Sequence, residues 1–381
     1  MSGRADGARS GIVDAAPPRP AISRRERHHR HDPTGPGTSR WARQPGLGLA
    51  GLLAVLPVAV LLAIGAGGAE ASLLVLAPLI TFALPVVSMI AFWWEDWPGT
   101  RLGPDWAGWA DTALIVLAGV VLAFLGEAVV GHLSLGALFD PAPDNLEFST
   151  FPATMPLAGA AFVVMLELTL VSEHWPLRRW LKPIPGGVCA VVLAWAIAIL
   201  LYVLLLGGTP FRGGGRGLLD PGVFGAALTC IGAWQVLLFV MWRGWPFRLI
   251  GRQWVRFGCA NAGTIGGGIL TFVVLNLWVP VPVLSALAGS FVAAGLVVGM
   301  QFEDALPARW PAWLERLVSL GLTLALAAVL YVALFALAGS LDWGRAAPVD
   351  WVGHVTLNAI GVSVILHVAI GRRWPLARKP A

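Results

Sequence analysis

The sequence predicts an all-α protein, a polytopic membrane helix bundle of about ten transmembrane helices. Three observations support this prediction: the composition, the length of the apolar runs and the placement of the cations. Of the 381 residues, 57% are hydrophobic and only 12% are charged, and the mean hydropathy is +0.75. So few charged side chains cannot cover a water-soluble surface, which favours a protein whose outer surface meets lipid.

The apolar runs have the length that a bilayer requires. A hydrocarbon core of about 30 Å needs roughly 20 residues of α-helix. Helices are expected rather than barrel strands, because lipid does not tolerate unpaired backbone groups and the runs show no alternation of period two. The ten predicted segments are residues 47–65, 72–93, 110–130, 151–171, 187–206, 223–241, 262–278, 283–300, 317–337 and 351–370.

The Lys and Arg residues test this number of crossings. If the N-terminus is cytoplasmic and every segment crosses, the outer loops hold only three of the 26 Lys and Arg: Arg212, Arg216 and Arg345. The others fall in the tails and in the loops after even-numbered segments, as the positive-inside rule requires. We therefore expect a multi-pass protein of the cell (inner) membrane with both termini in the cytoplasm.

A Trp-Pro pair followed by Arg recurs at the cytoplasmic end of the even-numbered segments. It stands at Trp97, Trp175, Trp245, Trp310 and Trp374. Trp favours the headgroup level, Pro stops the helix from continuing, and Arg fixes the side of the membrane. The pattern is therefore interpreted as an anchor without chemistry of its own.

The recurrence also predicts an internal repeat. Counting 27 positions from each of the first three of these Trp residues reaches an aromatic residue: Phe124, Tyr202 and Phe272. Counting 14 from the second and third reaches Cys189 and Cys259. We interpret residues 46–371 as one transmembrane domain of five repeated hairpins, with two-helix units that begin near residues 97, 175, 245 and 310.

The two tails are predicted to be cytoplasmic and basic. Residues 1–45 are rich in Arg, His, Pro and Gly, so they cannot bury a core and should be disordered. Their charge, with that of residues 372–381, favours anionic lipids of the inner leaflet as partners. Nothing predicts a nucleic acid partner. The His-rich stretch His28 to His31 is interpreted as part of a solvated tail, with weak metal binding as the alternative.

Polar residues within the segments identify the candidate solute-binding site. Even-numbered segments contain Glu167, Gln235 and Asn358, whereas the first, fifth and ninth segments are almost wholly aliphatic. Polar side chains at membrane depth face a bundle interior or a wet cavity, so the even segments are expected to form the inner layer. Glu127 of the third segment joins the candidates. The alternatives are that both carboxylates reach the headgroups and that Gln235 bonds a neighbouring helix.

The glycine run "NAGTIGGGIL" allows two interpretations. Spacing such as Gly263-x-x-x-Gly267 lets another helix approach closely, and the eighth segment is the expected partner. The alternative is a broken helix whose free backbone groups bind a solute, as in transporters with discontinuous helices.

The His and Cys residues predict no cofactor and no metal site. His354 and His367 are 13 residues apart, hence about 140° apart around one helix, which disfavours a haem held between leaflets. A metal site of Glu127, His132 and His354 has only a shared depth to support it. Cys189, Cys230 and Cys259 form no disulfide framework.

Three functional hypotheses remain open. The first is a permease or channel-like carrier of a small or lipophilic solute, using Glu167, Gln235 and Asn358. The second is a membrane-embedded enzyme acting on a lipid, quinone or other apolar substrate, which needs groups such as Glu127, His132, His174 and His354 to converge on one reacting position. No catalytic residue is assigned, and an enzyme is the weaker hypothesis. The third is a non-catalytic membrane subunit of a complex, whose apolar odd-numbered helices dock against partners. A homo-oligomer and a membrane partner are both open for the chain.

Overall fold

The computed structural model describes residues 43–131, 134–144, 149–212, 217–307, 309–374 and 376. Across these residues the protein consists of helices, turns and loops without a β-strand, so the all-α prediction is confirmed. Almost all of the predicted tail 1–45, with its His-rich stretch, lies outside the described residues, as do His132 and most of the tail 372–381.

Nine helices of the described chain are long and apolar enough to cross a membrane, and a tenth is shorter. Several end in a π-helical segment, written η. The long helices are α2 (Gly46–Ile64), α3 with η2 (Ala69–Trp93), α4 (Pro104–Val130), α8 (Pro183–Leu206), α9 with η7 (Pro221–Met241), α10 (Gln253–Leu275), α11 with η9 (Val281–Gln301), α12 (Ala312–Ala338) and α13, η10, α14 and η11 in succession (Pro348–Ile370).

The fourth segment differs from the predicted residues 151–171. The chain first forms a single turn, α5 (Thr150–Ala153), and then α6 (Met155–Leu166), which continues as η6 (Glu167–Val171). Pro152 and Pro156 explain the interruption, because proline cannot donate a backbone hydrogen bond within a helix. Short turns α7 (Leu177–Trp180), η3 (Gly99–Arg101), η4 (Ala137–Phe139) and η8 (Phe247–Leu249) complete the helical structure.

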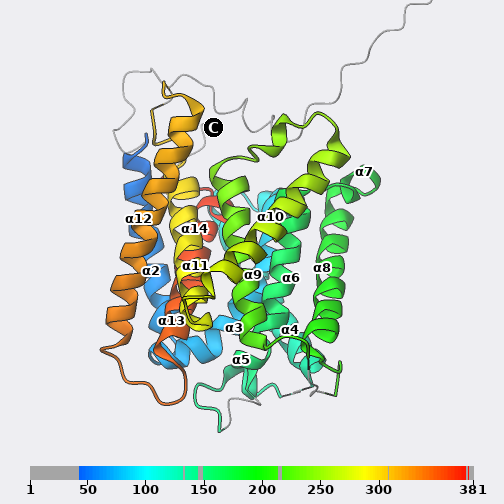
Figure 1. The fold of residues 1–381 in the computed structure, drawn as a ribbon, viewed down its shortest axis with the longest axis vertical. Coiled ribbons are helices and arrows are strands. Elements are labelled where there is room, and N and C mark those ends of the chain that lie inside the picture. The colour runs from blue at the N-terminus through cyan, green and yellow to red at the C-terminus, as the bar shows by residue number, and fades with distance from the viewer. Residues whose placement is uncertain are drawn as a thin grey trace, which may run out of the picture. The chain divides into compact units, whose positions relative to one another are not determined.

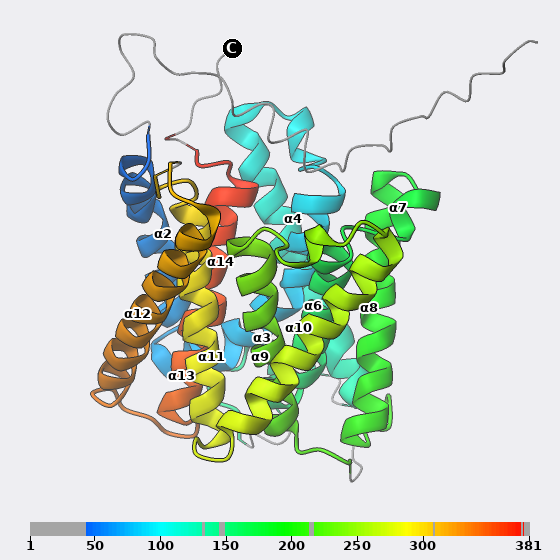
Figure 2. The same ribbon diagram turned by 45° about the horizontal axis from the view of Figure 1, so that its top comes forward.

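The even-numbered segments form a closed inner ring. In chain order α3 contacts α6, α6 contacts α9, α9 contacts α11, α11 contacts η10, and η11 returns to η2 at the end of α3. The odd-numbered helices pack outside this ring, and Figures 1 and 2 show α10 crossing obliquely over α9. In the most apolar window 83% of α3 is buried but only 6% of α12. This layering agrees with the distribution of polar residues in the sequence.

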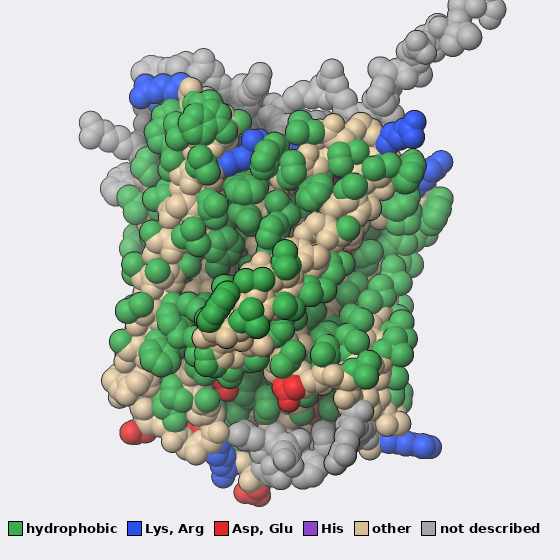
Figure 3. All heavy atoms as spheres, in the orientation of Figure 1, with side chains coloured by type: hydrophobic (Ala, Val, Ile, Leu, Met, Phe, Trp, Pro, Cys, Tyr) green, Lys and Arg blue, Asp and Glu red, His purple; other side chains and the backbone are tan. Residues whose placement is uncertain are grey.

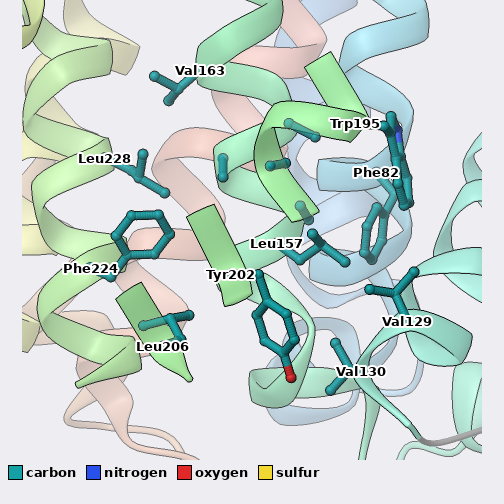
Figure 4. Close-up of a cluster of buried hydrophobic side chains, with 14 of the residues drawn as sticks. Phe82, Val129, Val130, Leu157, Val163, Trp195, Tyr202, Leu206, Phe224 and Leu228 are labelled. Carbon is teal, nitrogen blue, oxygen red and sulfur yellow. The ribbon is translucent and has the colours of Figure 1, made fainter. Parts of the chain in front are cut away.

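Large apolar side chains fill the space between ring and outer helices. One cluster, drawn in Figure 4, joins α3, α4, α6, α8 and α9. Within it Phe82 of the ring stacks on Trp195 of α8, with ring centroids 5.5 Å apart. Tyr202 lies further along α8 in the same cluster and is 8% exposed. Packing of this kind fixes each outer helix against its neighbours.

The glycine run lies in an unbroken helix, α10. Its close approach is to α9 rather than to the expected eighth segment, α11. A Cβ atom on Gly268 would lie 2.6 Å from the Cα of Ile231, and one on Gly267 would lie 2.7 Å from the Trp234 ring. The packing interpretation therefore fits better than a broken helix, but the partner was predicted wrongly, because residues adjacent in sequence need not face each other.

The inner-ring helices end in a recurring turn. In all five of them the first N–H after the π-helical end bonds the carbonyl five residues back, as Ser172 does to Glu167 at 2.8 Å. In four of the five, two residues in left-handed backbone conformation follow, such as Glu173 and His174, or a residue and a glycine in one copy. The equivalent first residues of the other three copies are Trp94, Trp242 and Gly371. Phe302 begins a similar turn before α12, with Ala305 in the place that Trp takes elsewhere.

We call the end of the bundle that carries these five turns the Trp-Pro face. Its Lys and Arg residues gather along the upper edge of Figure 3, above a wide band of hydrophobic side chains. Six ion pairs join these turns and the helix ends next to them into a circuit around the face. A single surface ion pair stabilises a fold by no more than about 1 kcal/mol. The six pairs are Glu95 with Arg178, Glu173 with Arg256, Arg243 with Glu303 and Asp304, Arg373 with Glu303, and Asp96 with Arg372.

The most exposed tryptophans of this end are not those of the Trp-Pro pairs. Trp175 is 36% exposed, and Trp97 and Trp245 pack edge-on against Trp94 and Trp242. Five other tryptophans, on or beside the outer helices, are 61% to 71% exposed: Trp106, Trp109, Trp180, Trp254 and Trp313. These five are the better candidates for a headgroup-level aromatic belt, and the paired tryptophans brace the turns.

Candidate functional site

The candidate site is a buried carboxylate, Glu167, where α6 passes into η6. Its side chain is only 7% exposed. It accepts a hydrogen bond from Nε2 of Gln235 at 2.9 Å, and Oγ1 of Thr264 lies 2.9 Å and 3.2 Å from its two oxygens. These partners are an amide and a hydroxyl, so the groups that hold the carboxylate are neutral.

Three different helices supply this cluster. Gln235 ends α9, is fully buried, and also donates to the carbonyl of Val163 at 3.0 Å. Its Oε1 atom has no hydrogen-bond partner in the described part of the chain. Thr264 of α10 can instead donate to the carbonyl of Ala260 at 3.0 Å. The amide and hydroxyl can therefore change hydrogen-bond partners without breaking a helix.

Glycines place Thr264 within reach of the carboxylate. Gly268 lies one turn after Thr264 and touches the backbone of α9 at Ile231, four residues before Gln235. A side chain at this position would push α10 away from α9. The small residues thus bring the hydroxyl and the amide to the same carboxylate.

A line of polar groups connects the cluster to the Trp-Pro face. One turn before Thr264, the amide of Asn261 donates to Oγ of Ser172 at 3.0 Å. Ser172 is followed by Glu173, whose carboxylate pairs with Arg256 at 3.0 Å. Glu173 and Arg256 border a narrow pocket, which is also lined by Val171, Phe257 and Ala260. In this conformation the pocket has no room for a water molecule. The site is therefore closed toward this face.

Asn358 belongs to a different group. Its amide lies 3.4 Å from the carbonyl of Ala77 and 3.4 Å from Nδ1 of His354, and its oxygen accepts from Thr81 at 3.3 Å. Nε2 of His354 lies 3.1 Å from the carbonyl of Leu62. These contacts join η10 and α13 to α2 and α3, so Asn358 lies inside the ring as expected but does not bond to the Glu167 cluster.

Glu127 lies near the opposite end of the bundle, three residues before the end of α4. It is 1% exposed, accepts from the hydroxyl of Thr150, and lies 3.4 Å from the backbone nitrogen of Ser134. Both partners belong to the connection between α4 and α6. The carboxylate therefore organises that connection.

The remaining His residues are dispersed. His174 sits in a turn of the Trp-Pro face, edge-on to Trp93 at 4.6 Å between centroids, and burial followed by the charge of Arg178 lowers its pKa to about 4. His367 lies near Gln301 and Gly51. Among the described residues no three His, Cys, Asp or Glu side chains lie close enough to hold a metal ion.

The sequence indicated Glu167 and Gln235 as candidates but not Thr264, which contacts the same carboxylate. The signal was present, because Thr264 is the one hydroxyl residue inside the glycine run. Asp111 was also missed. It is fully buried in α4 and accepts from the backbone N–H of Gly99 at 2.9 Å, beneath the turn that follows η2.

The fold and the site define a helical bundle with membrane-length apolar helices and a carboxylate that is held by neutral donors between the inner ring and α10. No family model, no curated protein and no solved structure matches the chain. Its function must therefore be argued from its own geometry.

Proposed function

We propose that the protein is a multi-pass carrier, or permease, of a small or lipophilic solute in the cell membrane. Five hairpins cross the bilayer, the Trp-Pro face and both termini are cytoplasmic, and the basic tails meet anionic lipids. The recurring turn and the concentration of Lys and Arg at one end support this orientation. Glu167 and Gln235, joined by Thr264, form the proposed solute site, while Asn358 and Glu127 hold helices and loops together.

The observation that carries the proposal is the environment of Glu167. A charged side chain at membrane depth costs roughly 2.5 to 3.5 kcal/mol on insertion scales. Here the carboxylate has two neutral donors, and Gln235 retains an oxygen without a partner in the described chain. Such a group gains by taking up a proton or a cationic solute, which suits a site that binds and releases.

The enzyme hypothesis has less support. It requires several acid-base groups at one position, but Glu127 contacts Thr150 and Ser134, whereas His354 contacts Asn358 and Leu62. His174 lies in a turn of the Trp-Pro face. The described groups thus have separate partners.

The carrier proposal is tested by measuring whether a reagent reaches the site from each side of the membrane. Thr264→Cys is placed in a chain whose native Cys residues are replaced by Ala, reconstituted in vesicles, and treated with membrane-impermeant sulfonatoethyl methanethiosulfonate on either side. We expect the thiol to react from both sides at measurable rates, because a carrier exposes its site alternately.

Thr356→Cys is the matched control. Thr356 is as fully buried as Thr264 and also bonds the carbonyl four residues back, at 2.9 Å, but it lies outside the cluster. It should react from neither side. A Thr264→Cys thiol that reacts from neither side, or no faster than the control, contradicts a carrier and leaves a structural subunit.

A further inference from the structure

We propose that Glu167 exchanges its proton with the cytoplasmic solution through the line Thr264, Asn261 and Ser172, and that the Glu173–Arg256 ion pair is the gate of this path. The inference rests on the proposed function, and it adds the coupling ion and its route. Water that enters beside these polar groups carries the proton, because an amide does not relay it. In each exchange a hydronium ion gives one proton to the Glu167 carboxylate and leaves a water molecule.

Successive contacts define the route. The hydroxyl of Thr264 lies 2.9 Å from the Glu167 carboxylate and 3.1 Å from the backbone carbonyl of Asn261. The side-chain amide of Asn261 donates to the hydroxyl of Ser172 at 3.0 Å. Thr264 is fully buried, and Ser172 is 7% exposed. A polar line of this kind between apolar helices is costly unless it serves water or ions, so it marks a path.

The ion pair lies at the mouth of this line. Glu173 and Arg256 side chains are 16% and 19% exposed, and both border the narrow pocket next to Val171 and Ala260. Val171 is one turn beyond Glu167, and Ala260 is one turn before Thr264. Nε of Arg256 is buried without a hydrogen-bond partner in the described residues, so water that enters as the pair opens finds a donor to bind.

Few other charges face the route. On the turn after η6 they are Glu173 and His174, on η8 the cation is Arg248, which also borders the pocket, and on α10 it is Arg256, which lies over the ring of Phe257 at 4.8 Å. The titratable side chain of α9 is Cys230, which packs against Phe272 and Leu284 in a separate cluster. Glu167 is therefore the carboxylate at the inner end of the route.

The structure also contains a control for the gate. Glu95 occupies the same position in its turn as Glu173, with left-handed φ values of 54° and 48°, and pairs with Arg178 at 2.9 Å. Glu95 is 72% exposed in its side chain. It belongs to the same circuit of ion pairs but does not border the pocket.

Proton uptake after an acid jump tests the proposal. The full chain is reconstituted in vesicles of sorted orientation, and the impermeant dye pyranine reports protons in the solution at the Trp-Pro face after a step from about pH 8 to about pH 5. Wild-type protein should take up one proton per chain more than Glu167→Gln. Glu173→Gln and Arg256→Gln should each speed this uptake about tenfold.

Three further results sharpen the test. Glu95→Gln should leave the rate unchanged, Asn261→Leu should slow it, and dye confined to the opposite side should report slower uptake. Gel filtration and thermal unfolding check that each variant is folded. If one of the two gate variants does not fold, the other still tests the gate.

The possible failures are distinguishable. If Glu167→Gln takes up as many protons as wild type, the proposed site itself is wrong. If that variant loses the proton while both gate variants keep the wild-type rate, or if Glu95→Gln speeds uptake equally, the path and its gate are overturned and the site stands.

Discussion

Glu167 and Glu127 are both buried carboxylates near the ends of membrane-length or near-membrane-length helices, and both accept a hydrogen bond from a threonine hydroxyl. They differ in what carries their partners. Thr264 and Gln235 belong to two helices that cross the bundle, whereas Thr150 and Ser134 belong to one connection. The first carboxylate therefore joins three separate helices, and the second holds a loop.

This difference shows that burial of an acidic residue does not by itself indicate function. A carboxylate bonded to its own connection has satisfied partners and little reason to change them. One bonded to neutral groups of separate helices, with an unpartnered amide oxygen beside it, can exchange them for a solute or a proton. The following predictions separate the two cases.

The largest expected effect is the loss of the proton that Glu167 takes up. Glu167→Gln should lower the uptake measured with pyranine by one proton per chain, because the amide cannot take up a proton in this pH range. Glu127→Gln, its matched variant, should take up as many protons as wild type. Loss of one proton in both variants would erase the distinction between the carboxylates.

The next largest effect is a dependence of stability on pH, and it arises at His174, in the turn that follows the Glu167 helix. The folded pKa of His174 is about 4, against an ordinary value of 6.5. Between these values the unfolded chain binds a proton that the folded chain does not, so stability falls as the pH is lowered from 6.5 to about 4.

The loss should reach about 3 kcal/mol in wild type and disappear in His174→Gln. Thermal unfolding of detergent-solubilised protein across this range measures it. Identical pH dependence in the two proteins would show that His174 is not held neutral.

Removing a threonine hydroxyl should separate stability from proton uptake. Thr150→Val leaves the fully buried Glu127 only the long contact of 3.4 Å to Ser134, so the free energy of unfolding should fall by about 2 kcal/mol. Thr264→Val leaves Glu167 its bond to Gln235, so about 1 kcal/mol is expected.

Proton uptake should respond in the opposite order, with Thr264→Val altered and Thr150→Val unchanged. Denaturant titration and the pyranine assay provide the two measurements. If the two variants lose the same stability and take up protons alike, the prediction is wrong.

The smallest effect comes from the glycines that align the site. Gly268→Ala should destabilise by about 1 to 2 kcal/mol, because its Cβ meets the backbone of Ile231, which cannot move aside easily. Gly266→Ala, two residues earlier, meets open space and should be neutral or slightly stabilising. Equal thermal stability of the two variants would contradict the close approach of α9 and α10.

Much of the fold could be predicted because it follows from the solvent. The apolar runs gave nine of the spanning helices within a few residues at most ends, although α10 begins nine residues before the predicted start at 262. The early turns of α10 carry Gln253, Arg256 and Asn261, and a hydropathy pattern cannot show that a helix continues into a polar region. The interruption before α6 was encoded in two prolines but was not predicted.

The candidate site was predictable only in part. The scarcity of polar residues indicated Glu167, Gln235, Asn358 and Glu127, since each is conspicuous among aliphatic neighbours. Their grouping depended on helix rotation and depth, which carry no signal along the chain. Thr264 was hidden for the same reason, because a threonine in a membrane helix commonly bonds its own backbone.

By itself, the sequence determined that this chain is an all-helical bundle of membrane-length segments, because composition and run length respond to lipid whatever the packing. Only the tertiary structure decided that α3, α6, α9, α11 and the last segment close into a ring, and that Glu167 meets Gln235 and Thr264 while Asn358 and Glu127 do not. The reason is physical: hydrophobicity decides which residues leave water, but contacts of a few ångströms decide which side chains meet.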